Sequence, residues 1–477
     1  MNKNKLGFVI SAALLTTSML AGCGGSGSGG GDEDAEVTRA HDSREFAPAA
    51  DVSFEASAGA SAYYGTYEGI QGPAVYAAEI PDGWNGYGLI MYTHGYRGTG
   101  ETLDVSVPDA AWRATVLAAG YAWAASSYSA NYYDVRAAIE DTNKLALEVM
   151  DYIETDFGNA YDDPQQILIS GYSLGGHTAA AAVDRENMER TAYPVDYQGA
   201  APFCQAEQNQ FQWLGDYPRV VQELSGFGDE PYEDFQQNLP SMLASLFALD
   251  GSDVDWSQPN AAGEKLKVIA MNLTGGERPI FYDFGFPNPA LQGAVLGTGG
   301  SNGDVTGILA GNIYDNTGRE YRWTDSDPMS VDEENFNDQV DRVSADSGVN
   351  PLRDDGVRWI PLVQGDFDVP VLTMHTLGDF YVPFRHQQLY RERAIENGSD
   401  GMLVQRAIRA PSHCDFTGTE ISTALVDWLT WVNGGPKPDG DEVLDPAIVA
   451  DPAYGCDHTV DDGTQNRAAL GLPACPI

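Results

Sequence analysis

Basic side chains are scarce in this chain. Its 477 residues include 26 Lys and Arg against 70 Asp and Glu, which gives a formal net charge of -44. Such a surface would repel nucleic acid and anionic lipid, so the composition excludes both as binding partners. A dense carboxylate surface usually keeps a protein soluble in salty water, where screening removes most of the self-repulsion. We therefore interpret the charge as a sign of a saline habitat.

Internal repeats and membrane-length apolar runs are also lacking. The apolar stretch near the N-terminus is too short for a stable membrane span. With 43% hydrophobic and 20% charged residues, and with 53 glycines and 26 prolines spread along the chain, the composition is that of a folded globular protein. The length allows either one enlarged domain or two domains.

The N-terminal segment predicts export. Residues 1–22 have Lys3 and Lys5 near their start, continue through an apolar stretch and end in Leu-Ala-Gly before Cys23, which is the layout of a secretory signal peptide. This ending resembles the bacterial lipobox, which implies that Cys23 becomes a lipidated first residue. Gly24 follows instead of an aspartate, and by resemblance to lipoprotein sorting in Gram-negative bacteria this favours the outer membrane. Residues 23–45 are rich in glycine, serine and acidic residues, so we expect a flexible tether.

Few cysteines remain after Cys23: they are Cys204, Cys414, Cys456 and Cys475. An even number in an oxidising compartment predicts two disulfides, although three pairings are possible. Proximity in the chain favours Cys456 with Cys475, which leaves Cys204 with Cys414. The alternative is that Cys414 is an unpaired, small apolar residue.

The hydrophobic pattern predicts an α/β fold with a mostly parallel sheet flanked by helices. Between residues 74 and 202, apolar β-branched runs alternate with helical patterns, and the alternation resumes at Val369. We predict strands at Val75–Ile80, Gly88–Thr93, Gly120–Ser127, Gln166–Ser170, Asp196–Pro202, Val369–His375 and Leu403–Arg409. We predict helices over residues 135–153, from Gly175, over Pro383–Asn397 and over Ile421–Trp431.

The alternation breaks between residues 203 and 365. This stretch is rich in Gln, Asn, Asp, Gly and aromatic residues, and we predict that it is an insertion after the sixth strand, able to serve as a cap or lid. The core domain would then comprise residues 46–202 and 366–435. Residues 436–477 would form a surface tail pinned by a disulfide.

A Gly-x-Ser-x-Gly pattern directly follows the predicted strand Gln166–Ser170. A sharp strand-to-helix turn requires glycine at positions 171 and 175, because neighbouring backbone comes so close to the turn that a side chain at either position would clash. Ser173 would then stand at a helix N-terminus, where the helix dipole and free N–H groups favour a developing negative charge. Ser173 is therefore our candidate nucleophile.

Four motifs of the chain resemble those of the α/β-hydrolase superfamily, and they occur in the order that the superfamily shows. The Gly-x-Ser-x-Gly turn is one of them. Upstream of the serine, the strand Gly88–Thr93 ends in His94-Gly95-Tyr96, similar to the element from which these enzymes draw one oxyanion-hole donor. The resemblance implies that the backbone N–H groups of Tyr96 and Leu174 hold the oxyanion. We expect His94 to prop this loop.

The resemblance also implies the other two members of a catalytic triad, in the order serine, acid, histidine. The loop 378–383 looks like the family's Gly-Asp-x-x-Val-Pro loop, which implies Asp379 as the acid. Asp366 and Asp368 lie before the strand, and we expect them in a turn or on the surface.

The base is expected after the next strand, where His413 follows Leu403–Arg409. We expect core or surface roles for His375 and His386, and packing or substrate-side lining for His177. His41 and His458 fall in the predicted tether and tail. A disulfide between Cys204 and Cys414 would hold the loop that carries the histidine.

Our first hypothesis is a carboxylesterase or lipase-like serine hydrolase that forms an acyl-enzyme and requires no metal or organic cofactor. The alternatives are a serine peptidase or aminopeptidase, with Glu207, Glu223 or Arg278 as a terminus anchor, and a non-catalytic binding protein. Asp-rich turns do not match the EF-hand loop, so we predict no metal site. Aromatic residues of the insertion would line an acyl pocket or form the insertion's own core: Phe211, Trp213, Tyr217, Tyr232, Phe235 and Trp256.

Overall fold

The computed structural model describes residues 45–50, 53–299, 308–309, 311–352, 357–461 and 467–476. All of these belong to the unit Arg39–Ile477. The predicted signal peptide, Cys23 and almost all of the predicted tether lie outside the described residues. Of the helices that are described, none is long and apolar enough to cross a bilayer.

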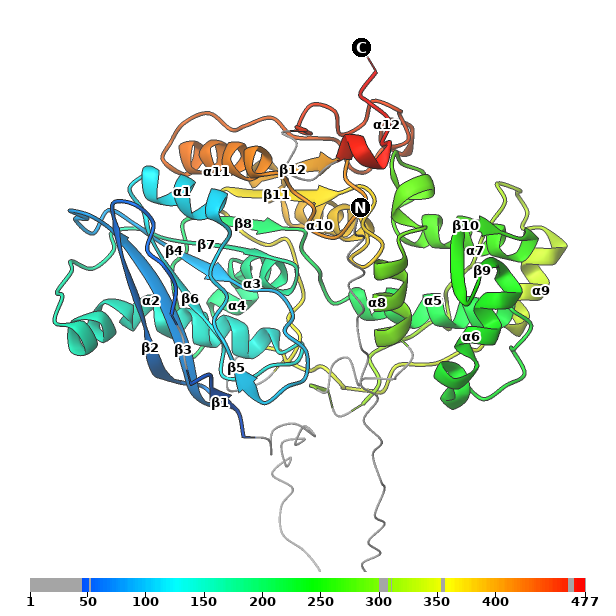
Figure 1. The fold of residues 1–477 in the computed structure, drawn as a ribbon, viewed down its shortest axis with the longest axis horizontal. Helices are drawn as coiled ribbons and strands as arrows, with labels where there is room; N and C mark the ends of the chain where they lie inside the picture. Colours follow the sequence, from blue (N-terminus) through cyan, green and yellow to red (C-terminus); the bar gives the residue numbers. More distant parts are fainter. Residues whose placement is uncertain are drawn as a thin grey trace, which may run out of the picture. The chain divides into compact units, whose positions relative to one another are not determined.

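A mixed, mostly parallel sheet forms the centre of the fold (Figure 1). Within the described residues it has eight strands, in the spatial order β2-β3-β6-β4-β7-β8-β11-β12. β3 is antiparallel to β2 and to β6, which lie on either side of it, while the strands from β6 to β12 are parallel to one another. The strands are β2 (Ala60–Gly69), β3 (Gly72–Pro81), β4 (Leu89–Thr93), β6 (Ala122–Ser126), β7 (Ile167–Tyr172), β8 (Ala200–Phe203), β11 (Val371–Thr376) and β12 (Leu403–Ile408). The predicted fold class is confirmed.

Helices cover both faces of the sheet, and each face has its own apolar core. Along β3, Ala74, Tyr76 and Ala78 point to one core, whereas Val75 and Ala77 point to the other. The first core receives the helices α2 (Val135–Phe157), α3 (Leu174–Ala182) and α10 (Arg385–Asn397). The second receives α1 (Ala110–Ala118) and α11 (Gly418–Val432). Burial on both faces explains why these strands are apolar without alternation.

The helix α2 shows how local sequence determines an element. Its N-cap Asp134 accepts a hydrogen bond from the Ala137 N–H at 2.9 Å, and its C-cap Gly158 has a φ of 75°. These are the residue types that helix ends favour. The apolar face of this helix is buried, including Ile139, Val149 and Ile153.

The chain leaves the sheet after β8, the sixth of its strands in sequence order, and returns at β11. The elements in between are α5 (Gln210–Leu224), α6 (Phe235–Leu246), β9 (Phe247–Asp250), β10 (Asp253–Pro259), α7 (Ala261–Leu273), α8 (Pro289–Gly299) and α9 (Val331–Gln339). They carry much more helix than the sequence pattern indicated. Five of the six aromatic residues proposed for an acyl pocket are buried in the first core, and Tyr232 packs against that core. These residues therefore fit the alternative that they form a core better than the alternative that they line a pocket.

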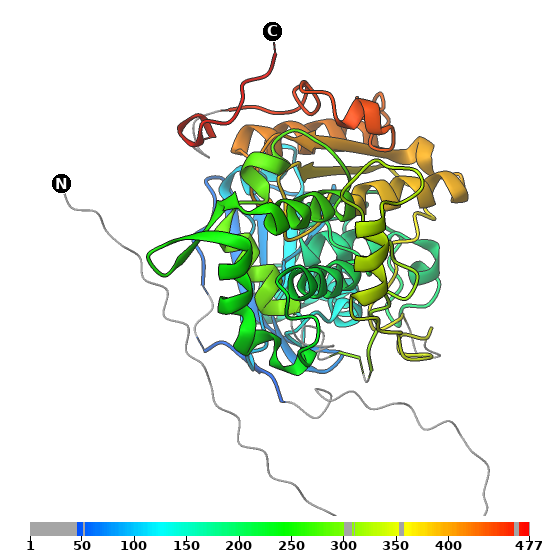
Figure 2. The same cartoon turned by 90° about the vertical axis from the view of Figure 1, so that its right-hand side faces the viewer.

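The chain after Gly434 runs over β12 and α11, as Figures 1 and 2 show in orange and red. Asp441 donates its N–H to the Gln405 carbonyl at 2.7 Å, and its carboxylate accepts from the Ala407 N–H at 2.7 Å. The tail therefore satisfies backbone groups at the edge of the sheet, where unpaired N–H and C=O groups would otherwise be exposed. It contains the short helix α12 (Pro446–Val449) and the disulfide Cys456–Cys475.

Some boundaries differ from the sequence predictions. The strand predicted for Asp196–Pro202 begins only at Ala200, because the Gln198 side chain instead accepts a hydrogen bond from the Ile167 N–H at 2.8 Å. The edge strand β2 and the nine-residue helix α1 were not predicted. Only β3 pairs with β2 in the described sheet, and the exposed edge leaves β2 without the long apolar run that marks a central strand.

Candidate active site

The turn between β7 and α3 presents Ser173. This residue has φ 61° and ψ -120°, a conformation that costs a non-glycine residue roughly 1–3 kcal/mol. A Cβ at Gly171 would overlap the Thr93 side chain, and one at Gly175 would overlap the Thr93 carbonyl. Glycine is therefore required at both predicted positions, because the neighbouring strand β4 passes directly against the turn.

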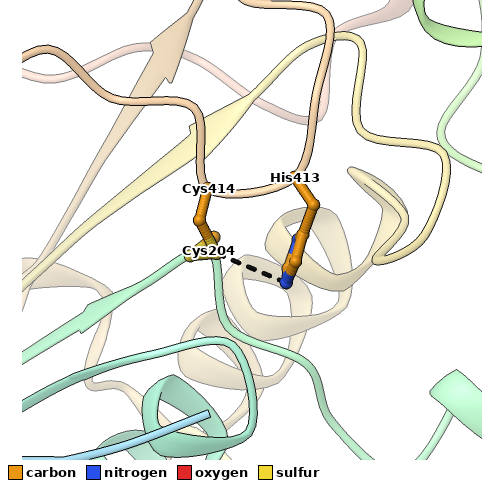
Figure 3. A group of neighbouring side chains, drawn as sticks. All are labelled: Cys204, His413 and Cys414. Carbon is orange, nitrogen blue, oxygen red and sulfur yellow. Dashed lines mark hydrogen bonds between the residues drawn. A yellow bond between two sulfur atoms is a disulfide. The ribbon is translucent and has the colours of Figure 1, made fainter. Parts of the chain in front are cut away.

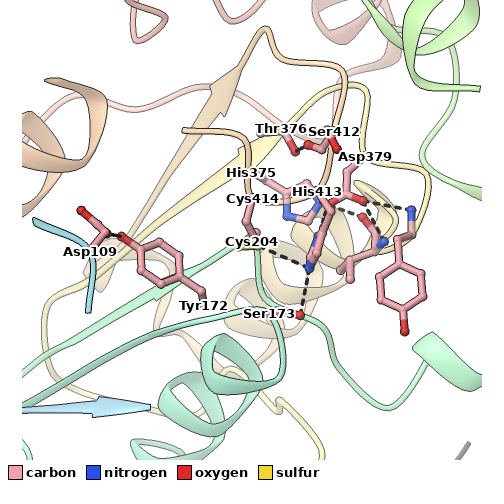
Figure 4. The surroundings of a disulfide bond; sticks show 12 residues. Asp109, Tyr172, Ser173, Cys204, His375, Thr376, Asp379, Ser412, His413 and Cys414 are labelled. Carbon is pink, nitrogen blue, oxygen red and sulfur yellow. Dashed lines mark hydrogen bonds and ion pairs between the residues drawn. A yellow bond between two sulfur atoms is a disulfide. The ribbon is translucent and has the colours of Figure 1, made fainter. Parts of the chain in front are cut away.

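Ser173, His413 and Asp379 form one chain of hydrogen bonds. The Ser173 hydroxyl lies 2.8 Å from His413 Nε2, and His413 Nδ1 lies 2.5 Å from Asp379 Oδ2 (Figure 4). These residues come from the ends of β7, β11 and β12, which meet at one edge of the parallel sheet. In this arrangement Nδ1–H donates to the carboxylate, which leaves the Nε2 lone pair free to accept the serine proton.

The surroundings of Asp379 favour the ionised carboxylate. Burial raises its pKa, but the charge and hydrogen bond of His413 outweigh burial, so the pKa of Asp379 falls below its ordinary value. Its other oxygen accepts N–H groups from Tyr381 at 3.0 Å and Val382 at 2.9 Å. The loop that carries the acid thus orients it by its own backbone, as a fixed triad acid requires.

The predicted oxyanion donors are the backbone N–H groups of Tyr96 and Leu174. A Cβ on Gly95 would lie 3.4 Å from the Ser173 Cβ, so the loop after β4 packs directly against the serine. Among the described residues, neither Tyr96 N–H nor Leu174 N–H donates to another group of the chain. Both predicted oxyanion donors are therefore available for a ligand oxygen.

His94 holds this loop, as predicted. Its Nδ1 lies 2.7 Å from the Gly95 carbonyl oxygen, and its ring stacks on Tyr128 with the centroids 4.0 Å apart. Burial lowers the pKa of His94 to about 4, so the ring is neutral at ordinary pH. A neutral, buried imidazole can support the loop without adding charge to the site.

Cys204 and Cys414 form a disulfide, and Cys456 pairs with Cys475, which is the predicted pairing. Cys414 Sγ lies 3.3 Å from His413 Nε2, so the disulfide touches the candidate base itself (Figure 3). In the described part of the chain, Cys204, His413 and Cys414 are the group whose donor atoms come close enough for a metal ion. The two sulfurs are bonded to each other, however, and a metal would need a thiolate.

The other candidate histidines and carboxylates have different roles. His177 is buried between the Tyr133 hydroxyl at 3.0 Å and the Pro361 carbonyl at 2.7 Å, so it packs and does not face Ser173. His375 Nε2 donates to the Val382 carbonyl at 2.9 Å. Asp366 is on the surface beside Arg185, and Asp368 is exposed.

Two candidate anchors for a peptide terminus are already engaged. Glu207 is buried in an ion pair with Arg393 at 2.7 Å. Arg278 is buried and donates to the carbonyl oxygens of Leu377 at 2.8 Å and Gly276 at 2.9 Å. Its contact with Leu377, two residues before Asp379, ties the predicted insertion to the acid loop. The third candidate anchor, Glu223, lies at the C-terminal end of α5.

Sequence reasoning missed two groups that support the site. The Tyr381 ring packs edge-on against His413 with the centroids 5.6 Å apart. The Thr376 hydroxyl donates to the Ser412 carbonyl at 2.7 Å, beside the base (Figure 4). Tyr381 lies inside the Gly-Asp-x-x-Val-Pro loop, so its position next to the acid was the one available signal.

Comparisons with known proteins give distant similarities. The chain matches no protein-family model. It is 22% identical over 407 residues to an o-phthalyl amidase from Xanthobacter agilis, covering 76% of this chain and 86% of that protein.

Similar solved structures are esterases. Feruloyl esterase B from Aspergillus oryzae is 15% identical, with a TM-score of 0.42 over 82% of this chain and 91% of that one. Another esterase from Aspergillus oryzae is 13% identical, with a TM-score of 0.43 over 77% and 78%. The cell wall degrading esterase LipA from Xanthomonas oryzae is 13% identical, with a TM-score of 0.33 over 79% and 88%. Because these scores are below 0.5, the fold assignment depends on the strand order and the function on the site geometry.

Proposed function

We propose that this protein is a serine carboxylic ester hydrolase that works through an acyl-enzyme. The observation that carries the proposal is the unbroken chain Ser173–His413–Asp379, with links of 2.8 and 2.5 Å, at a strained strand-to-helix turn. Strained backbone at a polar, converging site is typical of pre-organised chemistry. The non-catalytic alternative leaves this arrangement unexplained.

The geometry supports a two-step cycle. His413 Nε2 takes the Ser173 proton as the serine oxygen attacks the ester carbonyl carbon. The carbonyl oxygen becomes an oxyanion and accepts hydrogen bonds from the N–H groups of Tyr96 and Leu174. His413 then gives its proton to the departing alcohol, and the bond from carbon to the alcohol oxygen breaks.

The second half repeats the first with water. His413 deprotonates a water molecule that attacks the acyl-serine, and the returned proton releases Ser173 and the carboxylic acid. Asp379 stays ionised and stabilises the imidazolium in both halves. The cycle needs no metal or organic cofactor.

Amide hydrolysis is the second candidate, and the amidase relative is the observation that favours it. The same groups would act, with an amine as the leaving group. The peptidase form of this alternative has less support, because Glu207 and Arg278 are buried and engaged with other groups of the chain.

We also propose that the enzyme works outside the cytoplasm, exported by residues 1–22 and tethered to the outer membrane through lipid on Cys23. Two disulfides in the folded part support an oxidising compartment. Labelling with a radioactive fatty acid, compared between the wild type and Cys23→Ser, tests the anchor. Equal labelling of both proteins would contradict it.

The test of the activity compares p-nitrophenyl esters of graded acyl length with p-nitroanilides. Ser173→Ala should lower kcat for esters by roughly a million-fold, as removal of a triad serine does elsewhere. Ser422→Ala in α11 is the control, because Ser422 accepts a hydrogen bond from the Thr115 hydroxyl of α1 at 2.9 Å and is not a member of the triad. Anilide turnover alone would favour the amidase, and equal ester turnover in Ser173→Ala would contradict both.

A further inference from the structure

The loop that carries His413, here the histidine loop, residues 411–417, has contacts with other elements, and those at residues 412, 414 and 415 lie next to the base in the chain. The Thr376 hydroxyl holds the Ser412 carbonyl, and the disulfide to Cys204 holds residue 414. The third attachment is at Asp415, whose carbonyl accepts a hydrogen bond from Arg467 Nη2 at 2.6 Å. The first comes from β11 and the second from the residue that follows β8, but the third comes from the C-terminal tail.

Arg467 also forms a paired contact with Glu420. Its Nη1 lies 2.7 Å from Glu420 Oε1, and its Nη2 lies 2.9 Å from Oε2. Both side chains are buried, with 3% and 0% of their surface exposed. A buried, bidentate pair of this kind has a defined geometry, because the planar guanidinium matches the carboxylate at two points.

Glu420 connects this pair back to the histidine loop. Its Oε2 accepts the Thr417 N–H at 2.8 Å, and the Thr417 hydroxyl accepts the Glu420 N–H at 3.2 Å, which together form the capping box of α11. Its Oε1 accepts the Val460 N–H of the tail at 2.8 Å. One carboxylate thus joins the end of the histidine loop, the start of α11 and two segments of the tail.

The tail is fastened on either side of Arg467. The disulfide Cys456–Cys475 closes a loop that contains it. Arg409, at the end of β12, donates to the carbonyl oxygens of Pro452 at 2.8 Å and Pro473 at 3.3 Å. The two bonds from Arg467 to Glu420 are enough to neutralise the charge of the Glu420 carboxylate. The further bond from Arg467 to the Asp415 carbonyl therefore indicates that Arg467 also holds the histidine loop.

We propose that Arg467 is a positioning residue for His413, and that the C-terminal tail is part of the catalytic apparatus. The proposal rests on the proposed function of the triad. Loss of the Arg467 contact frees the Asp415 carbonyl, two residues beyond the base, and lets the imidazole shift relative to the Ser173 oxygen. A displacement of about 1 Å at a catalytic group can lower kcat up to a hundredfold, and KM changes little because Arg467 does not touch the substrate.

The experiment compares Arg467→Met, Arg467→Lys and the matched control Arg113→Met. Arg113 makes the same kind of contacts, two bonds to the buried Glu79 at 2.9 and 2.8 Å and one to the Glu55 carbonyl at 2.7 Å. It serves β3, near the opposite edge of the sheet from β12. A comparable loss of stability is therefore expected in both methionine variants.

Arg467→Met should lower kcat for a p-nitrophenyl ester by about tenfold or more, with KM within about twofold and an altered pH profile of kcat. Arg113→Met should leave kcat and the pH profile unchanged. Arg467→Lys should regain stability through the charge on Glu420 but recover little kcat, because an ammonium lacks the planar fork that reaches Asp415 as well. Equal kcat in Arg467→Met and Arg113→Met would overturn the proposal.

Hydrogen exchange separates this failure from failure of the proposed function. Backbone amides of residues 411–420 should exchange at least tenfold faster in Arg467→Met than in the wild type, and those of β3 should not change. This result is expected even if the wild type hydrolyses no ester. Unchanged exchange in the histidine loop would overturn the role of Arg467, whatever the activity of the wild type.

Discussion

Removal of the Cys204–Cys414 disulfide is the perturbation that we expect to separate stability from activity. The bond joins residues 210 positions apart. In the chain-entropy description, a closed loop of that length restricts the unfolded chain by about 18 cal/mol/K, or about 5 kcal/mol at 25 °C. The loop of 19 residues closed by Cys456–Cys475 corresponds to about 3 kcal/mol in the same description.

Backbone strain reduces the first of these values. Cys204 has a φ of 42° and Cys414 a φ of 52°, in the left-handed region where a residue with a Cβ costs about 1–2 kcal/mol. When the bond is absent, both residues can relax to negative φ and recover about 2–4 kcal/mol. We therefore expect Cys204→Ser/Cys414→Ser to lower the free energy of unfolding by about 2 kcal/mol, less than the loss of the shorter tail disulfide.

The same relaxation should cost activity. His413 precedes Cys414, and its Nε2 lies 3.3 Å from the sulfur, so a change in φ at Cys414 moves the imidazole away from Ser173. We expect kcat to fall by about tenfold to a hundredfold. Urea denaturation of both double variants and p-nitrophenyl ester kinetics measure the two quantities, after thiol titration has shown that the wild type is oxidised. A loss of about 5 kcal/mol with unchanged kcat would refute the relaxation argument.

Two further predictions concern the triad acid and the buried histidines. Asp379→Asn should fold normally, because its amide oxygen can still accept the N–H groups of the acid loop, but ester kcat should fall by about 10⁴ through the wrong imidazole tautomer. A kcat within tenfold of wild type would remove Asp379 from the triad. Burial lowers the pKa of five histidines of the described chain from 6.5 to about 4: His94, His177, His375, His386 and His458. The unfolded chain binds more protons below pH 6.5, so stability is present above that pH and is lost as the pH falls towards 4. Calorimetry from pH 7 to 4.5 should show a steady decrease of Tm, and a constant Tm would contradict this reasoning.

Local sequence was sufficient for the features that depend on near neighbours in the chain. The apolar runs predicted most strands of the central sheet, and Asp134 and Gly158 mark the ends of α2 by their own side-chain and backbone chemistry. The glycines at 171 and 175 predicted a tight turn, because only the absence of a Cβ allows β4 to pass so close. The triad residues were predicted from motif order, and the structure brings all three together.

The segment between β8 and β11 was much harder to predict. Two of its helices, α5 and α6, contain Pro218 and Pro240, and a proline in a sequence normally indicates the end of a helix. Aromatic residues there were compatible with either a pocket or a core. Trp213 and Tyr217 pack edge-on against Phe380 with the centroids 5.1 and 4.9 Å apart, which only the folded arrangement decides.

The sequence by itself determined most strands of the central sheet, the turn at Ser173 and the identity of the candidate triad, since each depends on contacts within a few residues or on motif order. Tertiary structure alone decided that the Cys204–Cys414 disulfide touches His413 Nε2, that His177 and His375 are neutral packing groups, and that Arg467 reaches Asp415. These contacts join segments up to 210 residues apart. Their existence depends on which strands become neighbours in the sheet, and no local pattern contains that information.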